Sequence, residues 1–218
     1  MRTFFSTPSR NNWLLILLLP AAALGADPVA LGQRAWEQLR AGDLAAATAT
    51  FQSMLTTNTD PLAQAGDLMA RRWLTRLDRE KVKTTLHAYY AQHLEYPATL
   101  PPNIQPPHDR WGIPWRYERT TTRFVRHLTN QTYRLESVRL GELSDLAAAL
   151  RVAYGQRIQL QPTRRDGQTV TFTLPGRAQP IVLSVGASFD GVDLAAVTTN
   201  TVILTDGDHW KTLPLPPR

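Results

Sequence analysis

The stretch DRWGIPWRY at residues 109–117 is where the chain is expected to change from helical to β structure. Asp109 can accept hydrogen bonds from the backbone of a following turn. Gly112 has no β-carbon and can adopt a positive φ angle, which a sharp turn requires. Pro114 fixes φ at a value suited to the start of a strand. These residue types in this order predict a tight turn that leads into a strand.

The two tryptophans of this stretch, Trp111 and Trp115, can each bury a large area where a sheet meets a helix. We expect their rings to pack on the preceding helix, against Leu86, Tyr89 and Tyr90. The stretch would then be a structural clasp. The alternative is an exposed aromatic platform that binds a sugar or a peptide, although paired aromatic residues at a turn more often belong to the core.

Helical patterns precede the clasp, and residues 61–77 and 78–94 each carry apolar side chains at helical spacing. The second helix is expected to end at Tyr96-Pro97, because proline cannot continue a helix and disfavours helical geometry in the residue before it. Residues 98–108 contain four prolines and no apolar period, which predicts an extended loop.

Short β segments follow the clasp. We predict a strand at residues 115–118, a polar turn at 119–122, a possible strand at 123–128 and a further strand at 132–138, whose alternating side chains share one face. Together with the preceding helix, these segments predict a small antiparallel sheet packed on a helix.

This order of elements resembles the globular part of the major pseudopilins of type II secretion systems. The resemblance covers about residues 78–140 and implies a helix that ends at a YP pair, a WGxPxxY turn and a small antiparallel sheet. A methylated apolar helix at the N-terminus, which the family uses to enter a pseudopilus, has no counterpart here. The family's calcium loop is not carried over, because VRLGELSD at 138–145 offers only Glu142 and Asp145. The matching residues are Tyr96, Pro97, Asp109, Trp111, Gly112, Pro114, Tyr117, Tyr133, Leu135 and Ser137, to which Trp115 is added as a clasp residue on its size alone.

The N-terminal part is predicted to form a helical hairpin, with helices at residues 29–41 and 44–55 and a break at Gly42-Asp43. The pair resembles one tetratricopeptide repeat, although it matches a plain N-terminal helical cap equally well. One such unit cannot bury its outer faces, so residues 61–77 are expected to supply the missing packing. The residues at the repeat's spacing are Leu31, Ala35, Gly42, Asp43, Leu44, Ala47, Phe51 and Leu55.

Residues 1–26 have the pattern of a secretory signal peptide. Arg2 and Arg10 precede a short apolar run at 13–19, and small residues follow. Cleavage is expected near Gly25 or Ala26, with an uncleaved anchor as the alternative. The mature chain is therefore expected to be periplasmic and to have no transmembrane segment, and a chain without cysteine suits such a location.

The net charge is +6, from 24 Lys and Arg against 18 Asp and Glu, and loss of the leader would leave 22 against 18. Such basicity would suit nucleic acid binding, but an exported protein does not meet nucleic acid, so none is expected as a partner. The densest basic run, residues 71–83, is interpreted as a solvated helix face. A more specific alternative is that this run binds an acidic partner or an anionic surface of the cell envelope.

The C-terminal part is predicted to be β-rich. Ser144 is expected to cap a short helix at residues 145–154, which Gly155 ends. Several short strands then follow, with a spacing typical of a small barrel or sandwich. Residues 181–218 resemble the homology-region domain that couples inner-membrane and pilus-assembly proteins to the secretin, at Val185, Gly186, Gly191, Val192, Leu194, Val197, Val202, Leu204, Gly207, Leu213 and Leu215.

Catalytic and metal-binding motifs are absent from the sequence. The histidines are not at ligand spacing, and no nucleophile elbow or phosphate-binding glycine loop occurs. We therefore expect neither an enzyme nor a bound cofactor or metal ion.

The sequence as a whole predicts an α+β chain with a signal peptide (1–26), a tetratricopeptide-like helical region (27–77), a pseudopilin-like α+β domain (78–140) and a β-rich domain (141–218). We expect a non-enzymatic assembly adaptor of a type II secretion or type IV pilus-like machine that takes part in protein transport. It would bind secretin, pseudopilin or inner-membrane platform subunits. The alternatives are a stand-alone periplasmic scaffold and a module that binds carbohydrate or peptide through Trp111 and Trp115.

Overall fold

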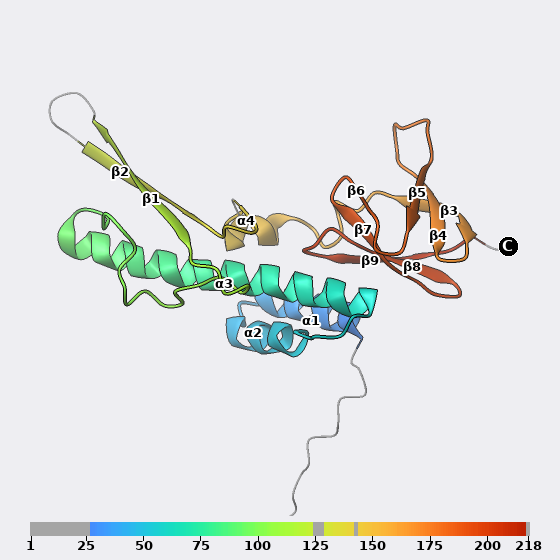
Figure 1. Cartoon of the computed structure of the whole chain (residues 1–218), viewed down its shortest axis with the longest axis horizontal. Coiled ribbons are helices and arrows are strands. Elements are labelled where there is room, and N and C mark those ends of the chain that lie inside the picture. The colour runs from blue at the N-terminus through green and yellow to red at the C-terminus, as the bar shows by residue number, and fades with distance from the viewer. Residues whose placement is uncertain (1–26, 124–128, 142–143, 217–218) are drawn as a thin grey trace, which may run out of the picture.

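One long helix organises the molecule. The computed structural model describes residues 27–123, 129–141 and 144–216. Helix α3 (Pro61–His93) runs through most of the length of the molecule, with helices α1 and α2 beneath its first half (Figure 1). A two-stranded hairpin rises beside its second half, and a β-rich unit lies at its first end. The chain is an α+β protein.

Helices α1 (Pro28–Arg40) and α2 (Leu44–Ser53) form the predicted hairpin, with bounds close to those expected. Aspartates begin both helices: Asp27 accepts a hydrogen bond from the backbone of Val29, and Asp43 accepts one from Ala46. Gly42 has a φ of 82° between them, a value that suits glycine. The local sequence therefore sets this turn.

Helix α3 is continuous, whereas the sequence suggested two segments at residues 61–77 and 78–94. No glycine or proline interrupts it there, and the polar run around Asp78 is buried against other elements rather than forming a break. Leu94 ends the helix with a left-handed φ of 58°, shortly before Pro97. The expected domain boundary after residue 77 thus lies within a helix.

Strands β1 (Arg116–Arg123) and β2 (Thr129–Glu136) pair antiparallel, with Tyr117 opposite Leu135. The predicted turn at 119–122 is wrong, because this threonine-rich stretch continues the strand, as β-branched residues readily do. The possible strand at 123–128 lies, apart from Arg123, outside the described residues. The strand predicted at 132–138 begins three residues earlier and ends at Glu136.

Helix α4 (Leu146–Arg151) is shorter than the predicted 145–154, because Val152 is already extended. The prediction that Ser144 caps it is also wrong. Asp145 occupies the N-cap position and makes no side-chain cap hydrogen bond there. Its carboxylate pairs instead with cations of α3.

The C-terminal strands form two sheets that do not close into a barrel, in the order β3-β4-β5 and β6-β7-β8-β9. The apolar side chains between the two sheets form one core, as in a small sandwich. The strands are β3 (Gln161–Asp166), β4 (Thr169–Thr173), β5 (Ile181–Ser184), β6 (Ser188–Phe189), β7 (Val192–Val197), β8 (Thr201–Thr205) and β9 (Trp210–Pro214).

A second core joins the helices to this sandwich. Trp73 of α3, Phe51 of α2 and Trp36 of α1 share it with Trp210 of β9 and Ile203 of β8. The open face of the helical hairpin is therefore covered by α3 and by one sheet of the C-terminal unit. A third, smaller core lies between the second half of α3 and the hairpin β1–β2.

Candidate functional site

The DRWGIPWRY stretch forms a tight turn centred on the carboxylate of Asp109. Its Oδ1 accepts hydrogen bonds from the backbone of Trp111 (2.9 Å) and Ile113 (3.1 Å). Its Oδ2 accepts one from the hydroxyl of Ser137 (2.6 Å), just after β2. Gly112 has the positive φ expected of it, 74°. Asp109 is buried, so this one side chain fixes both the turn and the base of the hairpin.

The two tryptophans of the stretch have different environments. Trp115 is 5 % exposed and packs in the third core, and its indole Nε1 donates to the carbonyl of Pro106 (2.9 Å). Trp111 is half-buried, with the guanidinium of Arg139 over its ring at 5.4 Å. The two rings therefore do not form an exposed pair for a sugar or a peptide.

Most of the remaining clasp residues pack together against the surface of α3. Tyr96, Tyr117, Tyr133 and Leu135 pack around Leu86 and Val82 of the helix. Hydrogen bonds tie them to the loop: the hydroxyl of Tyr117 donates to the carbonyl of Pro97 (2.8 Å). Burial raises the pKa of the Tyr133 hydroxyl, which lies 3.1 Å from Nε2 of His87. Pro114, the last of them, forms an isolated antiparallel bridge with His108 beside the turn.

The expected contacts of Tyr89 and Tyr90 are wrong in detail. Tyr90 packs on Tyr96, with ring centroids 4.7 Å apart, and Tyr89 stacks on His93 at 4.0 Å. Of the three helix residues predicted to meet the tryptophans, Leu86 shares a core with Trp115. Ile104 of the proline-rich loop is buried in the same core, beside Leu86 and Trp115.

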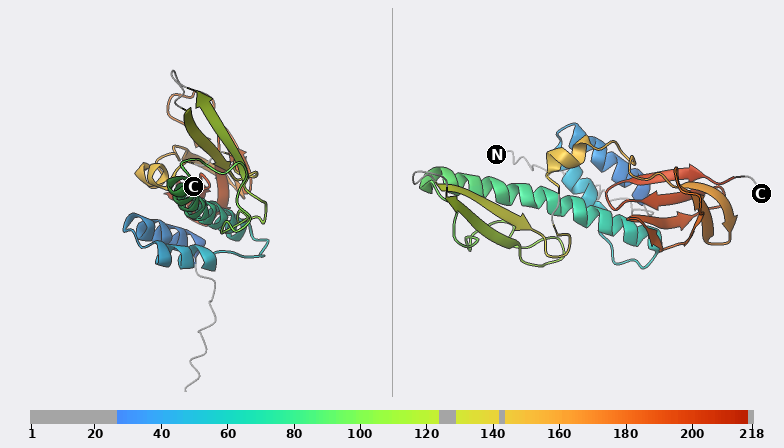
Figure 2. Two further views of the ribbon diagram at one scale, coloured as in Figure 1. Left: turned by 90° about the vertical axis from the view of Figure 1, so that its left-hand side faces the viewer. Right: turned by 90° about the horizontal axis from the view of Figure 1, so that it is seen from above.

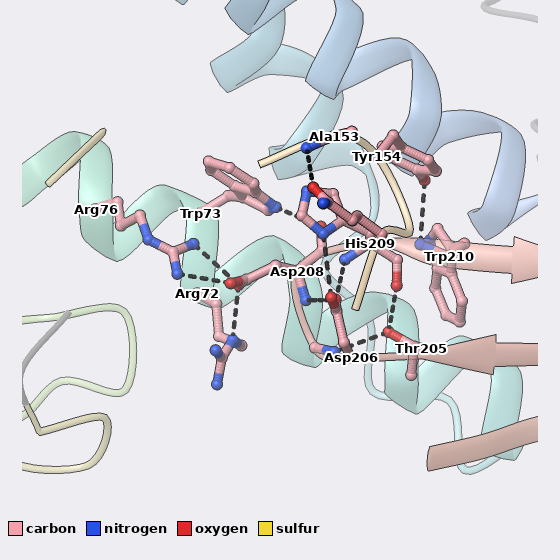
Figure 3. A network of polar contacts seen from close by, with 12 residues as sticks. Arg72, Trp73, Arg76, Ala153, Tyr154, Thr205, Asp206, Asp208, His209 and Trp210 are labelled. Atoms are coloured by element: carbon pink, nitrogen blue, oxygen red, sulfur yellow. Dashed lines mark hydrogen bonds and ion pairs between the residues drawn. The ribbon is translucent and has the colours of Figure 1, made fainter. Parts of the chain in front are cut away.

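A polar network that the sequence pattern did not single out joins α3 to the turn between β8 and β9 (Figure 3). Asp208 binds Arg76 through two hydrogen bonds of 2.9 and 2.8 Å and accepts another from Nε of Arg72 (3.0 Å). Its backbone carbonyl accepts a hydrogen bond from the indole of Trp73 (2.8 Å). All of these helix residues lie more than 130 positions away in the chain, so no local pattern could reveal the pairing.

The electrostatics of the network favour an ionised Asp208. Burial by itself raises the pKa of the carboxyl, but the hydrogen bonds and charges of Arg76 and Arg72 outweigh it and lower the pKa to about 2. His209, next to it, is 2 % exposed and lies between the rings of Trp36, Trp73 and Tyr154. The turn between β8 and β9 is thus buried, and it joins two parts of the chain.

The basic run at residues 71–83 is mostly paired within the chain, rather than being a solvated helix face. Arg76 and Arg79 are 3 % and 5 % exposed. Arg79 and Lys83 both bind the carboxylate of Asp145, each at 2.9 Å. A carboxylate from later in the sequence thus neutralises cations of α3.

A cavity of about 640 Å³ lies beside β2, α3 and the segment before α4. The β2 wall consists of Tyr133 to Glu136, and the other residues around it are Arg79, Lys83, Ser144 and Asp145. Within the described part of the chain, β2 has only β1 as a hydrogen-bonded neighbour, so its other edge is open toward this side. The described residues contain no group of three or more side chains arranged to hold a metal ion.

Comparisons of this chain with protein-family models, curated proteins and solved structures found no match. None of the helices in the described ranges combines the length and the apolar character that a bilayer crossing needs. The resemblances stated above therefore rest on the residues quoted for them.

Proposed function

We propose that this chain is a non-enzymatic assembly adaptor of the bacterial envelope that acts by binding other proteins. The observation that carries the proposal is the two-stranded sheet β1–β2. Each of its strands has one hydrogen-bonded neighbour among the described residues, so each presents an open edge. Open strand edges bind extended segments of partner proteins through backbone hydrogen bonds.

The position of this sheet supports the proposal. The first half of α3 is held between α1, α2 and the C-terminal sandwich, and the second half carries the hairpin away from them (Figures 1 and 2). A partner bound at the hairpin would sit at a fixed distance from a partner bound at the sandwich. An adaptor needs this geometry, because it must hold two proteins in a defined relation.

The proposed setting is the periplasm, after removal of a leader near Gly25 or Ala26, within a type II secretion or type IV pilus-like machine. The proposed partners are secretin, pseudopilin or inner-membrane platform subunits. Support comes from the leader pattern and from the two resemblances, which point to the same class of machine. The burial of Trp115 argues against the alternative of a carbohydrate-binding or peptide-binding module built on Trp111 and Trp115.

The test is affinity capture of the tagged, exported chain from native envelope extract, with mass spectrometry of the retained proteins. We expect secretin, pseudopilin or platform subunits to be retained at moderate salt. The control is the same chain unfolded by Asp208→Asn and heat, which exposes apolar surface but has no folded strand edge. Recovery of the same proteins by both, or of none by the native chain, would reduce the protein to a stand-alone scaffold.

A further inference from the structure

A second cavity, of about 740 Å³, lies between the start of α1, the chain that leads into β3, and strand β9. It is therefore placed where the helical part of the chain meets the C-terminal sandwich. Its volume lies within the range of roughly 300–1,000 Å³ that is typical of ligand sites, which often occur at interfaces between domains. The cavity thus has the size and the position of a ligand site.

The polar lining of this cavity consists largely of glutamine side chains. Four of them line it: Gln33 of α1, and Gln156, Gln159 and Gln161 from the chain that leads into β3. Each amide carries a carbonyl oxygen that accepts hydrogen bonds and an NH₂ group that donates two. Gln159 and Gln161 are exposed, and their side-chain amides have no hydrogen-bond partner among the described residues. The cavity therefore offers donors and acceptors side by side.

The charges around this cavity balance. Among the described residues that line it, Lys211 is the only charged one, and its Nζ already donates to the carbonyl of Ile158 (2.7 Å). Glu37 lies next to the lining, where its carboxylate accepts a hydrogen bond from Nε2 of Gln33 (3.0 Å). With one cation and one carboxylate, the site has no excess of either charge, so it suits a neutral polar ligand.

Tyr154 adds a partly buried hydrogen-bond donor to the lining. Its hydroxyl oxygen accepts a hydrogen bond from the backbone N–H of Trp210 (3.3 Å), as Figure 3 shows. The proton of this hydroxyl has no acceptor among the described residues. Burial raises the pKa of the hydroxyl to about 12, so the proton stays in place at neutral pH. A ligand with an acceptor oxygen would complete the hydrogen bonds of this side chain.

We propose that this cavity binds an oligosaccharide built from N-acetylated amino sugars. Sugar hydroxyl groups both donate and accept hydrogen bonds, as glutamine amides do, and they carry no charge. An acetamido group presents a carbonyl oxygen and an N–H in one plane, so it can form two hydrogen bonds with a single glutamine amide. Its methyl group needs an apolar contact, which Val29 and Pro175 on the cavity wall can supply. The inference goes beyond the adaptor function, because it assigns a further site with a different class of ligand.

A peptide is the main competing occupant, because it too is rich in neutral amides. A bound peptide strand is held mostly by a row of backbone groups along one strand edge. The polar groups of this cavity are instead side chains from α1, from the chain that leads into β3 and from β9. Groups that come from three elements suit a ring with polar atoms on all of its sides better than they suit an extended chain.

The experiment is calorimetric titration of the exported chain with two tetrasaccharides. The probe is the β-1,4-linked tetramer of N-acetylglucosamine. The matched comparison is the β-1,4-linked tetramer of glucose, which has a hydroxyl group in place of each acetamido group. We expect the acetylated tetramer to bind more tightly by about tenfold or more, because only its acetamido groups can form paired hydrogen bonds with the glutamine amides. Its binding should also slow amide hydrogen exchange between residues 153 and 161.

Three variants locate the binding. Gln159→Ala should weaken the acetylated tetramer about threefold to tenfold, because it removes one neutral hydrogen-bonding side chain. The matched control is Gln168→Ala, which removes an exposed glutamine that lies in the turn between β3 and β4 and does not line the cavity. Ala153→Trp places a large ring in the cavity from an exposed position, without removing a polar side chain, and should abolish binding. All three variants should unfold at a temperature near that of the wild type.

The proposal falls if the acetylated tetramer at millimolar concentration gives neither heat of binding nor slower exchange, or if both tetramers bind equally. It also falls if Gln168→Ala weakens binding as much as Gln159→Ala. If a capped tetramer of alanine protects residues 153–161 and the sugars do not, the site belongs to peptides and the proposal is wrong. These outcomes leave the adaptor function untouched, because that function is tested by capture of envelope proteins.

Discussion

The two halves of α3 are buried in different ways. Between Trp73 and Arg79 every residue is buried, so the helix is covered on all sides. Beyond Arg79 only Val82 and Leu86 are buried, one helical turn apart on a single face. One continuous helix therefore belongs to a core in its first half and to a surface in its second half.

Because of this difference, the first half of α3 contributes mainly to stability, and the second half has surface available for binding. A helix covered all round contributes to the core and tolerates little change, whereas a helix covered on one stripe leaves its other faces available. The first half joins α1, α2 and the sandwich, and the second half supports a hairpin with open edges. Substitutions in the two halves should accordingly differ in size and in how far their effects spread.

The largest effect is expected for Asp208→Asn. The change removes the carboxylate that compensates Arg76, which is 3 % exposed, and an unpaired buried charge costs about 3–5 kcal/mol. Urea unfolding should show this loss over the whole chain. Asp166→Asn, at the exposed end of β3, is the control and should change stability by less than about 0.5 kcal/mol. A loss below about 1 kcal/mol at Asp208 would mean that this junction does not hold the two parts together.

A slightly smaller and local effect is expected for Trp115→Ala. Truncation of a buried tryptophan costs about 3 kcal/mol or more, because a cavity remains where the ring was. Amide hydrogen exchange should speed up between residues 95 and 136, while α1, α2 and the sandwich keep their protection. Equal acceleration throughout the chain would show that the two halves of α3 unfold as one unit.

Low pH should reduce the stability of the core around the first half of α3 more than that of the core around its second half. The pKa of Asp208 is lower in the folded chain than in the unfolded chain, so the folded state binds fewer protons. The stabilisation is complete above about pH 4 and is lost as the pH falls toward 2, by about 2 kcal/mol. Urea unfolding between pH 2 and pH 7 measures this slope, and Asp208→Asn should flatten it. An unchanged slope in that variant would assign the acid sensitivity to other carboxylates.

The smallest effect is expected for Arg139→Ala. Removal of the guanidinium from the ring of Trp111 costs about 0.5–1 kcal/mol at a half-exposed site. Acrylamide should then quench more of the tryptophan fluorescence. Arg177→Ala is the control, because that guanidinium covers Phe189 and no tryptophan. Equal quenching in both variants would mean that Arg139 does not shield Trp111.

Local patterns predicted the individual elements well where one residue type has one physical role. The break predicted at Gly42-Asp43 separates two helices, Gly112 takes the positive φ angle expected of it, and β-branched and aromatic residues form strands. The errors occur where tertiary contacts override local preference. The polar stretch around Asp78 looked like a boundary, but ion pairs with Lys81 and Arg110 satisfy its carboxylate inside a continuous helix.

The candidate functional site also divides into parts that local sequence predicted and parts that only long-range contacts explain. The turn at Asp109 was predictable, because its hydrogen bonds connect residues that are close in sequence. The junction at Asp208 and the cavity beside β2 were not, because the groups that form them come from distant segments. No periodicity in the sequence records that an aspartate before α4 will bind cations of α3.

The sequence alone thus determined the N-terminal helical hairpin, the turn at Asp109 and the strand-rich C-terminal part, since each depends on backbone preferences and on the spacing of apolar residues. The tertiary structure decided which charges are neutralised, which tryptophan is buried and which strand edge stays open. These depend on long-range packing, in which a residue's environment is set by segments a hundred or more positions away.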